Sequence, residues 1–149
     1  MNILLTVGNG MMGDDGAGAL LAEMFREDPL ENWTVLNGGS APENVLHRMR
    51  AMDAQRVLVV DAADMDLPPG SIRLLPADRL NDPFLITTHT LPLTFLIESL
   101  RESVSQVELL GIQPGIVAFG FPISEEVRRA VEQVYAGLKN GAINWDSYN

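Results

Sequence analysis

Three aspartates lie at places in the sequence where carboxylate chemistry is feasible. Asp14 and Asp15 stand side by side in a loop with glycines at positions 8, 10, 13, 16 and 18, and Asp61 directly follows the apolar run 56–60. Clustered carboxylates repel one another unless they share a proton or bind a cation. The three acids are therefore candidates for acid–base chemistry or for a metal site. A helix cap or a loop-ordering acceptor explains Asp61 equally well.

One of the two histidines follows an extended segment, as the acids follow strands. His89 comes after residues 84–88 and before a helix-like segment, whereas His47 lies in the polar stretch HRMR, which is typical of a surface. Two carboxylates and one imidazole on strand-end loops would form a three-ligand metal site with open positions, and imidazole favours nickel, zinc, copper or iron. A lone histidine is more often a hydrogen-bonded structural residue, so spacing alone leaves both interpretations open.

The glycine loop, residues 8–18, contains the pattern G-x-G-x-x-G between a strand and a helix, as dinucleotide-binding loops do. We do not expect nucleotide binding, because Asp14 and Asp15 lie where a pyrophosphate would meet the helix and would repel it. The second strand also ends at Asn37 rather than at an acid. Two interpretations of the loop stay open: a tight turn with an aspartate cap, or a loop of little side-chain bulk that lets another backbone approach the carboxylates.

The elements that position these residues alternate between strand-like and helix-like segments. Apolar and β-branched runs predict strands at Ile3–Val7, Trp33–Leu36, Arg56–Val60, Ser71–Leu75 (a candidate antiparallel edge) and Val107–Ile112, and an extended segment at Phe84–Thr88. Apolar periodicity predicts helices at Ala17–Phe25, Glu43–Met52 and Leu93–Arg101, and a final helix capped by Ser124 with the buried stripe Val127, Ala130, Val131, Val134 and Leu138. Such units predict a mostly parallel sheet with helices on both faces, whose ligands bind beyond the carboxyl ends of the strands.

Composition narrows the class of protein. The chain has 149 residues, no cysteine, 20 acidic and 10 basic residues and a formal net charge of -10. Its length predicts one domain over residues 1–149, with a loose tail from about 140. Disulfides, thiolate zinc sites and a cysteine nucleophile are excluded, and a reducing, cytoplasmic compartment is expected. The acidic balance argues against nucleic-acid binding, and no apolar run approaches the ~20 residues of a membrane span.

Four motifs, in this order along the chain, resemble the hydrogenase maturation endopeptidases. They are Gly-Asn-Gly-Met-Met-Gly-Asp-Asp-Gly-Ala-Gly at 8–18, Val-Val-Asp-Ala-Ala-Asp around Asp61, Thr-His-Thr-Leu-Pro-Leu around His89, and Gly-Ile-Gln-Pro at 111–114. The resemblance runs from Met1 to about Leu138. The adjacent aspartates are similar to those of the subgroup that processes the large subunit of hydrogenase 3, in the formate hydrogenlyase system.

This resemblance implies a three-layer α/β/α sandwich around a twisted, mostly parallel five-stranded sheet. It implies an endopeptidase that removes a C-terminal extension from the large-subunit precursor of a [NiFe]-hydrogenase after nickel insertion. The nickel-interacting residues fall on Asp15, Asp61 and His89, which are the expected catalytic and metal-binding residues. Nickel is the expected cofactor, supplied by the substrate as a recognition signal, and a monomer is the expected oligomeric state.

Two mechanisms fit these residues. A metal held by Asp15, Asp61 and His89 would polarise the scissile carbonyl or activate a water, with Asp14 as a candidate general base. In the second mechanism, which we favour, the three residues contact nickel already in the substrate and position the bond, and a carboxylate activates water as in aspartic proteases. The alternative function is a non-catalytic nickel-binding module that docks on the large subunit, and it predicts metal binding without turnover.

Overall fold

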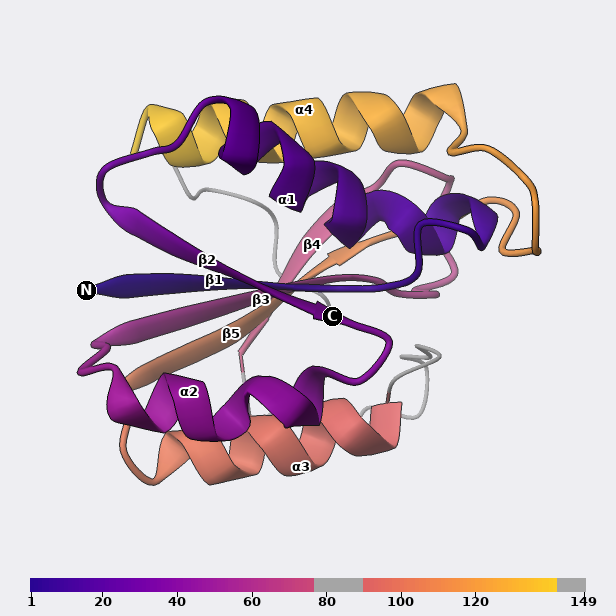
Figure 1. Ribbon diagram of the computed structural model, residues 1–149. Coiled ribbons are helices and arrows are strands. Elements are labelled where there is room, and N and C mark those ends of the chain that lie inside the picture. Colours follow the sequence, from indigo (N-terminus) through magenta and orange to yellow (C-terminus); the bar gives the residue numbers. More distant parts are fainter. Residues whose placement is uncertain (77–89, 142–149) are drawn as a thin grey trace.

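A sheet of five strands lies between two layers of helices (Figure 1). A computed structural model describes residues 1–76 and 90–141. The strands are β1 (Asn2–Val7), β2 (Trp33–Gly39), β3 (Arg56–Ala62), β4 (Ile72–Pro76) and β5 (Gln106–Ile112). Their order in the sheet is β2-β1-β3-β5-β4, and all neighbours are parallel except β4, which is antiparallel to β5 at one edge.

Helices cover both faces of this sheet. One face is covered by α1 (Ala17–Glu27) and α4 (Glu125–Lys139), and the other by α2 (Leu46–Ala51) and α3 (Thr90–Arg101). Short 3-10 helices, η1 (Gly13–Gly16) and η2 (Pro42–Val45), precede α1 and α2. The predicted α/β/α sandwich around a mostly parallel five-stranded sheet, with an antiparallel edge strand, is confirmed.

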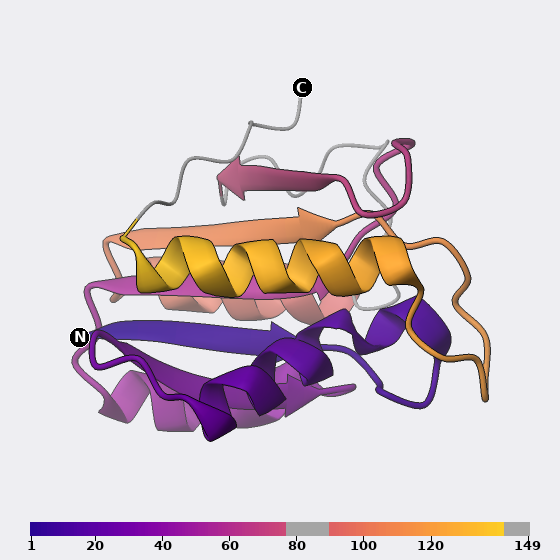
Figure 2. The ribbon, with the colours of Figure 1, turned by 90° about the horizontal axis from the view of Figure 1, so that it is seen from above.

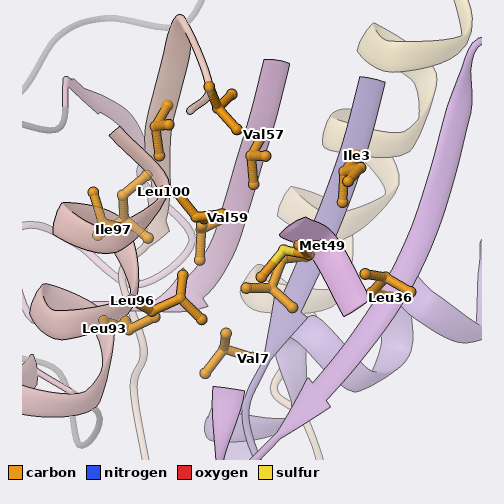
Figure 3. Close-up of a cluster of buried hydrophobic side chains, with 14 of the residues drawn as sticks. Ile3, Val7, Leu36, Met49, Val57, Val59, Leu93, Leu96, Ile97 and Leu100 are labelled. Carbon is orange, nitrogen blue, oxygen red and sulfur yellow. The ribbon is translucent and has the colours of Figure 1, made fainter. Parts of the chain in front are cut away.

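The inner strands are apolar on both faces because helices bury both. In β3, Val57 and Val59 face α2 and α3, while Leu58 and Val60 face α1 and α4, and all four are fully buried. Successive side chains of a strand point to opposite faces, so a doubly covered strand needs a continuous apolar run. The side chains on each face of the sheet form a separate hydrophobic core. Figure 3 shows the core between the sheet and the layer of α2 and α3, in which α3 packs on the sheet through Leu93, Leu96, Ile97 and Leu100.

The last helix follows its predicted pattern closely. The buried residues of α4 are the stripe Val127, Ala130, Val131, Val134 and Leu138. Ser124 caps the helix, since its hydroxyl accepts a bond from the Val127 N–H at 3.4 Å. Apolar residues three and four positions apart lie on one helix face, so the pattern alone identifies the side that packs on the sheet.

Asp61 lies within β3 rather than after it, which corrects the strand end predicted at Val60. The pairing of β3 with β5 continues through Ala62, with Asp61 opposite Gly111. The backbone of Asp61 is therefore held by the ladder, and its side chain is fully buried. In the same way β2 runs to Gly39, past the predicted end at Leu36.

The second helix is shorter than predicted, since Pro42 opens a 3-10 turn and α2 itself begins only at Leu46. The predicted extended segment at 84–88 lies outside the described residues, as does the tail from residue 142. Within the described ranges, no helix combines the length and apolar character that a membrane span requires.

Candidate active site

Two of the three predicted site residues lie on contacting elements at the carboxyl edge of the sheet. β1 and β3 are neighbours, and η1, which holds Asp15, contacts β3, which holds Asp61. Both side chains are buried, with Asp15 at 5% exposure and Asp61 at 0%. Buried carboxylates are costly unless they are hydrogen-bonded or paired with a cation. Two of them at the edge where such sheets bind ligands mark a candidate active site.

The turn that leaves β1 holds Asp15 in place. Its Oδ2 accepts a bond from the Asn9 N–H at 2.9 Å, and its own N–H donates to the Met12 carbonyl at 3.2 Å. The chain folds back so closely here that a Cβ at Gly8, whose φ is +131°, would lie 2.0 Å from the Asp15 carbonyl oxygen. Glycine at position 8 is therefore needed to bring Asp15 over the end of the strand.

Asp14 ties the glycine loop to the β5–α4 loop (residues 113–124). Its Oδ2 accepts bonds from the Gly115 N–H and the Ser124 hydroxyl, both at 2.8 Å, and its Oδ1 accepts from the Ser124 N–H at 2.7 Å. The first of the two interpretations of the glycine loop, a turn with an aspartate cap, is not observed, because α1 begins after Gly16 without a side-chain cap. Since Asp14 is only 1% exposed and accepts three bonds, we assign it a positioning role rather than that of general base.

The backbone that approaches the glycine loop belongs to the chain itself. The Asp14 N–H donates to the Ile116 carbonyl at 2.9 Å, and the Gly120 N–H donates to the Met11 carbonyl at 2.9 Å. At Gly13 a Cβ would lie 2.4 Å from the Ile116 oxygen. The low bulk of the glycine loop therefore serves a loop–loop contact, which agrees with the second of the two interpretations of the sequence. Figure 2 shows the two loops side by side beyond the sheet.

Gln113 is a buried polar residue whose role the sequence analysis missed. Its Oε1 accepts bonds from the N–H groups of Met65 (2.6 Å) and Leu67 (3.3 Å), and its Nε2 donates to Asp64 Oδ1 at 3.2 Å. These bonds join the end of β5 to the β3–β4 loop, a few residues after Asp61. The available signal was the Gly-Ile-Gln-Pro motif, in which a glutamine stands between an apolar strand and a proline.

The third predicted residue, His89, lies outside the described residues. The helix that follows it, α3, begins at Thr90 at this same edge of the sheet (Figure 1). Across residues 1–76 and 90–141, no three His, Cys, Asp or Glu side chains are grouped so that they could hold a metal ion. The described part of the site thus offers the carboxylates of Asp15 and Asp61, which fit a cation as two ligands of a larger set. His47 is exposed, as predicted.

A groove of about 520 Å³ lies elsewhere, between α1 and β2. Neither Asp15 nor Asp61 lines it, and its ionisable lining residues are Glu23 and Arg26, which pair with each other at 3.6 Å on the exposed side of α1. Large apolar pockets often bind ligands. This one has no unpaired charge for hydrolysis, so we place the chemistry at the sheet edge.

Removal of the Asp14 carboxylate is expected to loosen both loops. Asp14→Ala removes the three hydrogen bonds that this buried carboxylate accepts from Gly115 and Ser124, and should lower the free energy of unfolding by about 3 kcal/mol. Ser124→Ala removes one bond to Asp14 and the helix cap, and should cost about 1 kcal/mol. Urea unfolding measures both values. Glu132→Ala, which removes an exposed carboxylate from α4, is the control for charge. Equal stability of Asp14→Ala and this control would contradict the positioning role.

A mostly parallel α/β/α sandwich with buried acids at its carboxyl edge defines the class, an α/β protein with a candidate acidic active site. A family model described as hydrogenase maturation protease (HycI) matches residues 18–139. The chain belongs to this family, and it is therefore a peptidase, as the motifs predicted.

Individual relatives agree with this assignment. The hydrogenase 3 maturation protease of Escherichia coli K12 is 49% identical over 138 residues, which cover 93% of this chain and 88% of the relative. The solution structure of the endopeptidase HycI from Escherichia coli superposes with a TM-score of 0.92 at 46% identity, covering 100% of this chain and 97% of that one. The crystal structure of a [NiFe] hydrogenase maturation protease HycI from Thermococcus kodakarensis KOD1 has a TM-score of 0.83 at 26% identity, covering 96% of this chain and 92% of that one.

Proposed function

We propose that this chain removes the C-terminal extension of a [NiFe]-hydrogenase large-subunit precursor after nickel insertion, and that the nickel of the substrate is the recognition signal. The observation that carries the proposal is the burial of Asp15 and Asp61 on contacting elements at the carboxyl edge of the sheet. Membership of a hydrogenase maturation protease family supports the choice of substrate. The same family favours a protease over the alternative, a non-catalytic nickel-binding module.

Asp15, Asp61 and His89 are the residues that we assign to contact the substrate nickel. His89 enters through the resemblance of its motif, and the two aspartates through both motif and burial. Carboxylate and imidazole together suit a divalent transition metal. Near such an ion, the scissile carbonyl would be polarised and held in one orientation. The bond from the Asn9 N–H holds Asp15 in one orientation before any substrate arrives.

Hydrolysis needs a base for the attacking water, and a buried carboxylate is the base we assign. Asp15 or Asp61 accepts a proton from water as the water oxygen bonds to the carbonyl carbon. The same carboxyl group returns the proton to the leaving amine when the C–N bond breaks. This is aspartic-type chemistry with the water supplied by solvent. Asp14 holds the neighbouring loops and transfers no proton.

We further propose that the chain works as a monomer in the cytoplasm, with neither nucleic acid nor membrane as a partner. The absence of cysteine favours a reducing compartment. A net charge of -10 disfavours contact with phosphate backbones and with a second, equally acidic copy.

The test is the intact mass of a nickel-loaded large-subunit precursor after incubation with this chain. We expect the loss of one C-terminal peptide from the nickel-loaded precursor and no change in a nickel-free one. Failure to cleave a precursor that another maturation protease does cleave would overturn the proposed substrate. Nickel-dependent binding without cleavage would instead support the non-catalytic module.

A further inference from the structure

The loops beside the candidate active site display an unusual concentration of exposed apolar side chains. Of the seven large hydrophobic residues that are exposed within the described ranges, five lie on the glycine loop and the β5–α4 loop. They are Met11 (61% exposed), Ile116 (57%), Val117 (39%), Phe119 (70%) and Phe121 (48%), which we call the apolar rim. Clustered exposed apolar residues mark interaction sites, whereas scattered ones need no explanation.

The apolar rim also carries no charged side chain, in a chain whose formal net charge is -10. Residues 109–124 contain no Asp, Glu, Lys or Arg, and neither do residues 2–13, although charged residues make up 20% of the chain. Exposed loops are ordinarily polar because they face water. An exposed loop that combines two phenylalanines with no charge therefore fits a surface that is covered by an apolar partner.

Hydrogen bonds to a buried carboxylate and between the two loops hold the apolar rim in place. Asp14 accepts three hydrogen bonds from Gly115 and Ser124, which lie at the two ends of the exposed stretch. Backbone bonds from the Gly120 N–H to Met11 and from the Phe121 N–H to Ala118 brace its tip. Aromatic side chains on a braced loop lose little conformational entropy when a partner covers them.

The position of the rim identifies its partner. Asp14, which anchors the rim, is bonded in the chain to Asp15, one of the two carboxylates of the candidate site. The loops that carry the rim extend beyond the carboxyl ends of the strands, where a substrate must approach (Figure 2). A chain segment whose peptide bond reaches Asp15 must therefore pass beside the rim.

We propose that the apolar rim is the docking surface for an apolar segment of the protein substrate next to the scissile bond, an inference that rests on the proposed function. The rim binds this segment through Phe119 and Phe121, and the neighbouring carboxylates perform the cut. The two regions then recognise different parts of the substrate. The candidate site contacts the metal centre, and the apolar rim contacts the polypeptide. A second copy of this chain is a poorer occupant, because two chains of charge -10 repel each other.

The test compares cleavage kinetics of nickel-loaded precursor for the double variant Phe119→Ser/Phe121→Ser and for Phe95→Ser. Phe95 is 59% exposed on α3, in the opposite helix layer, and is the matched control. We expect the double variant to raise KM by about tenfold or more, as loss of aromatic anchors does at interfaces, with kcat unchanged. The control should leave both values as in the wild type. Thermal unfolding should be unchanged in both variants, since the side chains are exposed.

The outcomes separate this inference from the proposed function. If wild type does not cleave the precursor, the proposed function fails. If wild type cleaves and the double variant keeps the wild-type KM, the docking surface is overturned while the proposed function stands. A wild type that sediments as a dimer, with a monomeric double variant of normal KM, would identify the rim as a self-association surface and would also overturn the proposal.

Discussion

Asp61→Asn is expected to reduce cleavage of nickel-loaded precursor by about 10²–10⁴-fold, the usual contribution of a general acid–base group. The substitution keeps the size of the side chain and removes its charge and its capacity to take a proton. Because a neutral amide is less costly to bury than a carboxylate, the melting temperature should stay the same or rise. Single-turnover cleavage and calorimetry measure the two effects. Asp15→Asn and His89→Ala should lower cleavage by a similar factor.

Asp53→Asn is the matched control for this experiment, because it makes the same chemical change at an exposed position before the amino end of β3, the strand whose carboxyl end carries Asp61. It should cleave as the wild type does. Wild-type cleavage by Asp61→Asn, with the control also active, would remove Asp61 from the site. A loss of cleavage that is accompanied by unfolding would point to a structural role for the carboxylate.

Gly13→Ala is expected to push the glycine loop away from the β5–α4 loop and to lower cleavage by about 10²-fold. Its Cβ would lie 2.4 Å from the Ile116 carbonyl oxygen, so one backbone must move. A displacement of about 1 Å near the reacting groups has an effect of this size. Overpacking should also lower the free energy of unfolding by about 1–3 kcal/mol.

Gly120→Ala separates the effect of this contact from the effect of backbone strain. Gly13 and Gly120 have φ values of +60° and +81°, so an alanine is strained at both, but a Cβ at Gly120 meets no atom within 4 Å. We expect Gly120→Ala to cost about 1 kcal/mol in stability and to leave cleavage near the wild-type rate. Equal activity of the two variants would show that the contact between the loops does not govern the site.

Local patterns in the sequence were sufficient for most of the architecture. The stripe from Val127 to Leu138 identified the buried face of α4, and the apolar run 56–60 identified an inner strand covered on both sides. Both features repeat with the period of their own element, so neighbours in sequence carry the information. The antiparallel edge strand near Ser71 was also predicted correctly.

The candidate acids were found from sequence, but their roles were decided by tertiary contacts. Asp14 and Asp15 are adjacent and of the same type, yet Asp14 anchors a loop and Asp15 belongs to the candidate site. The difference comes from Gly115 and Ser124, which donate to Asp14 from more than 100 residues further along the chain. Asp61 likewise belongs to β3 because β5 continues to pair with it. Sequence determined which residues can do chemistry, since side-chain type is local. Only the folded chain decided which of them are already engaged, because hydrogen-bond partners are brought together by distant segments.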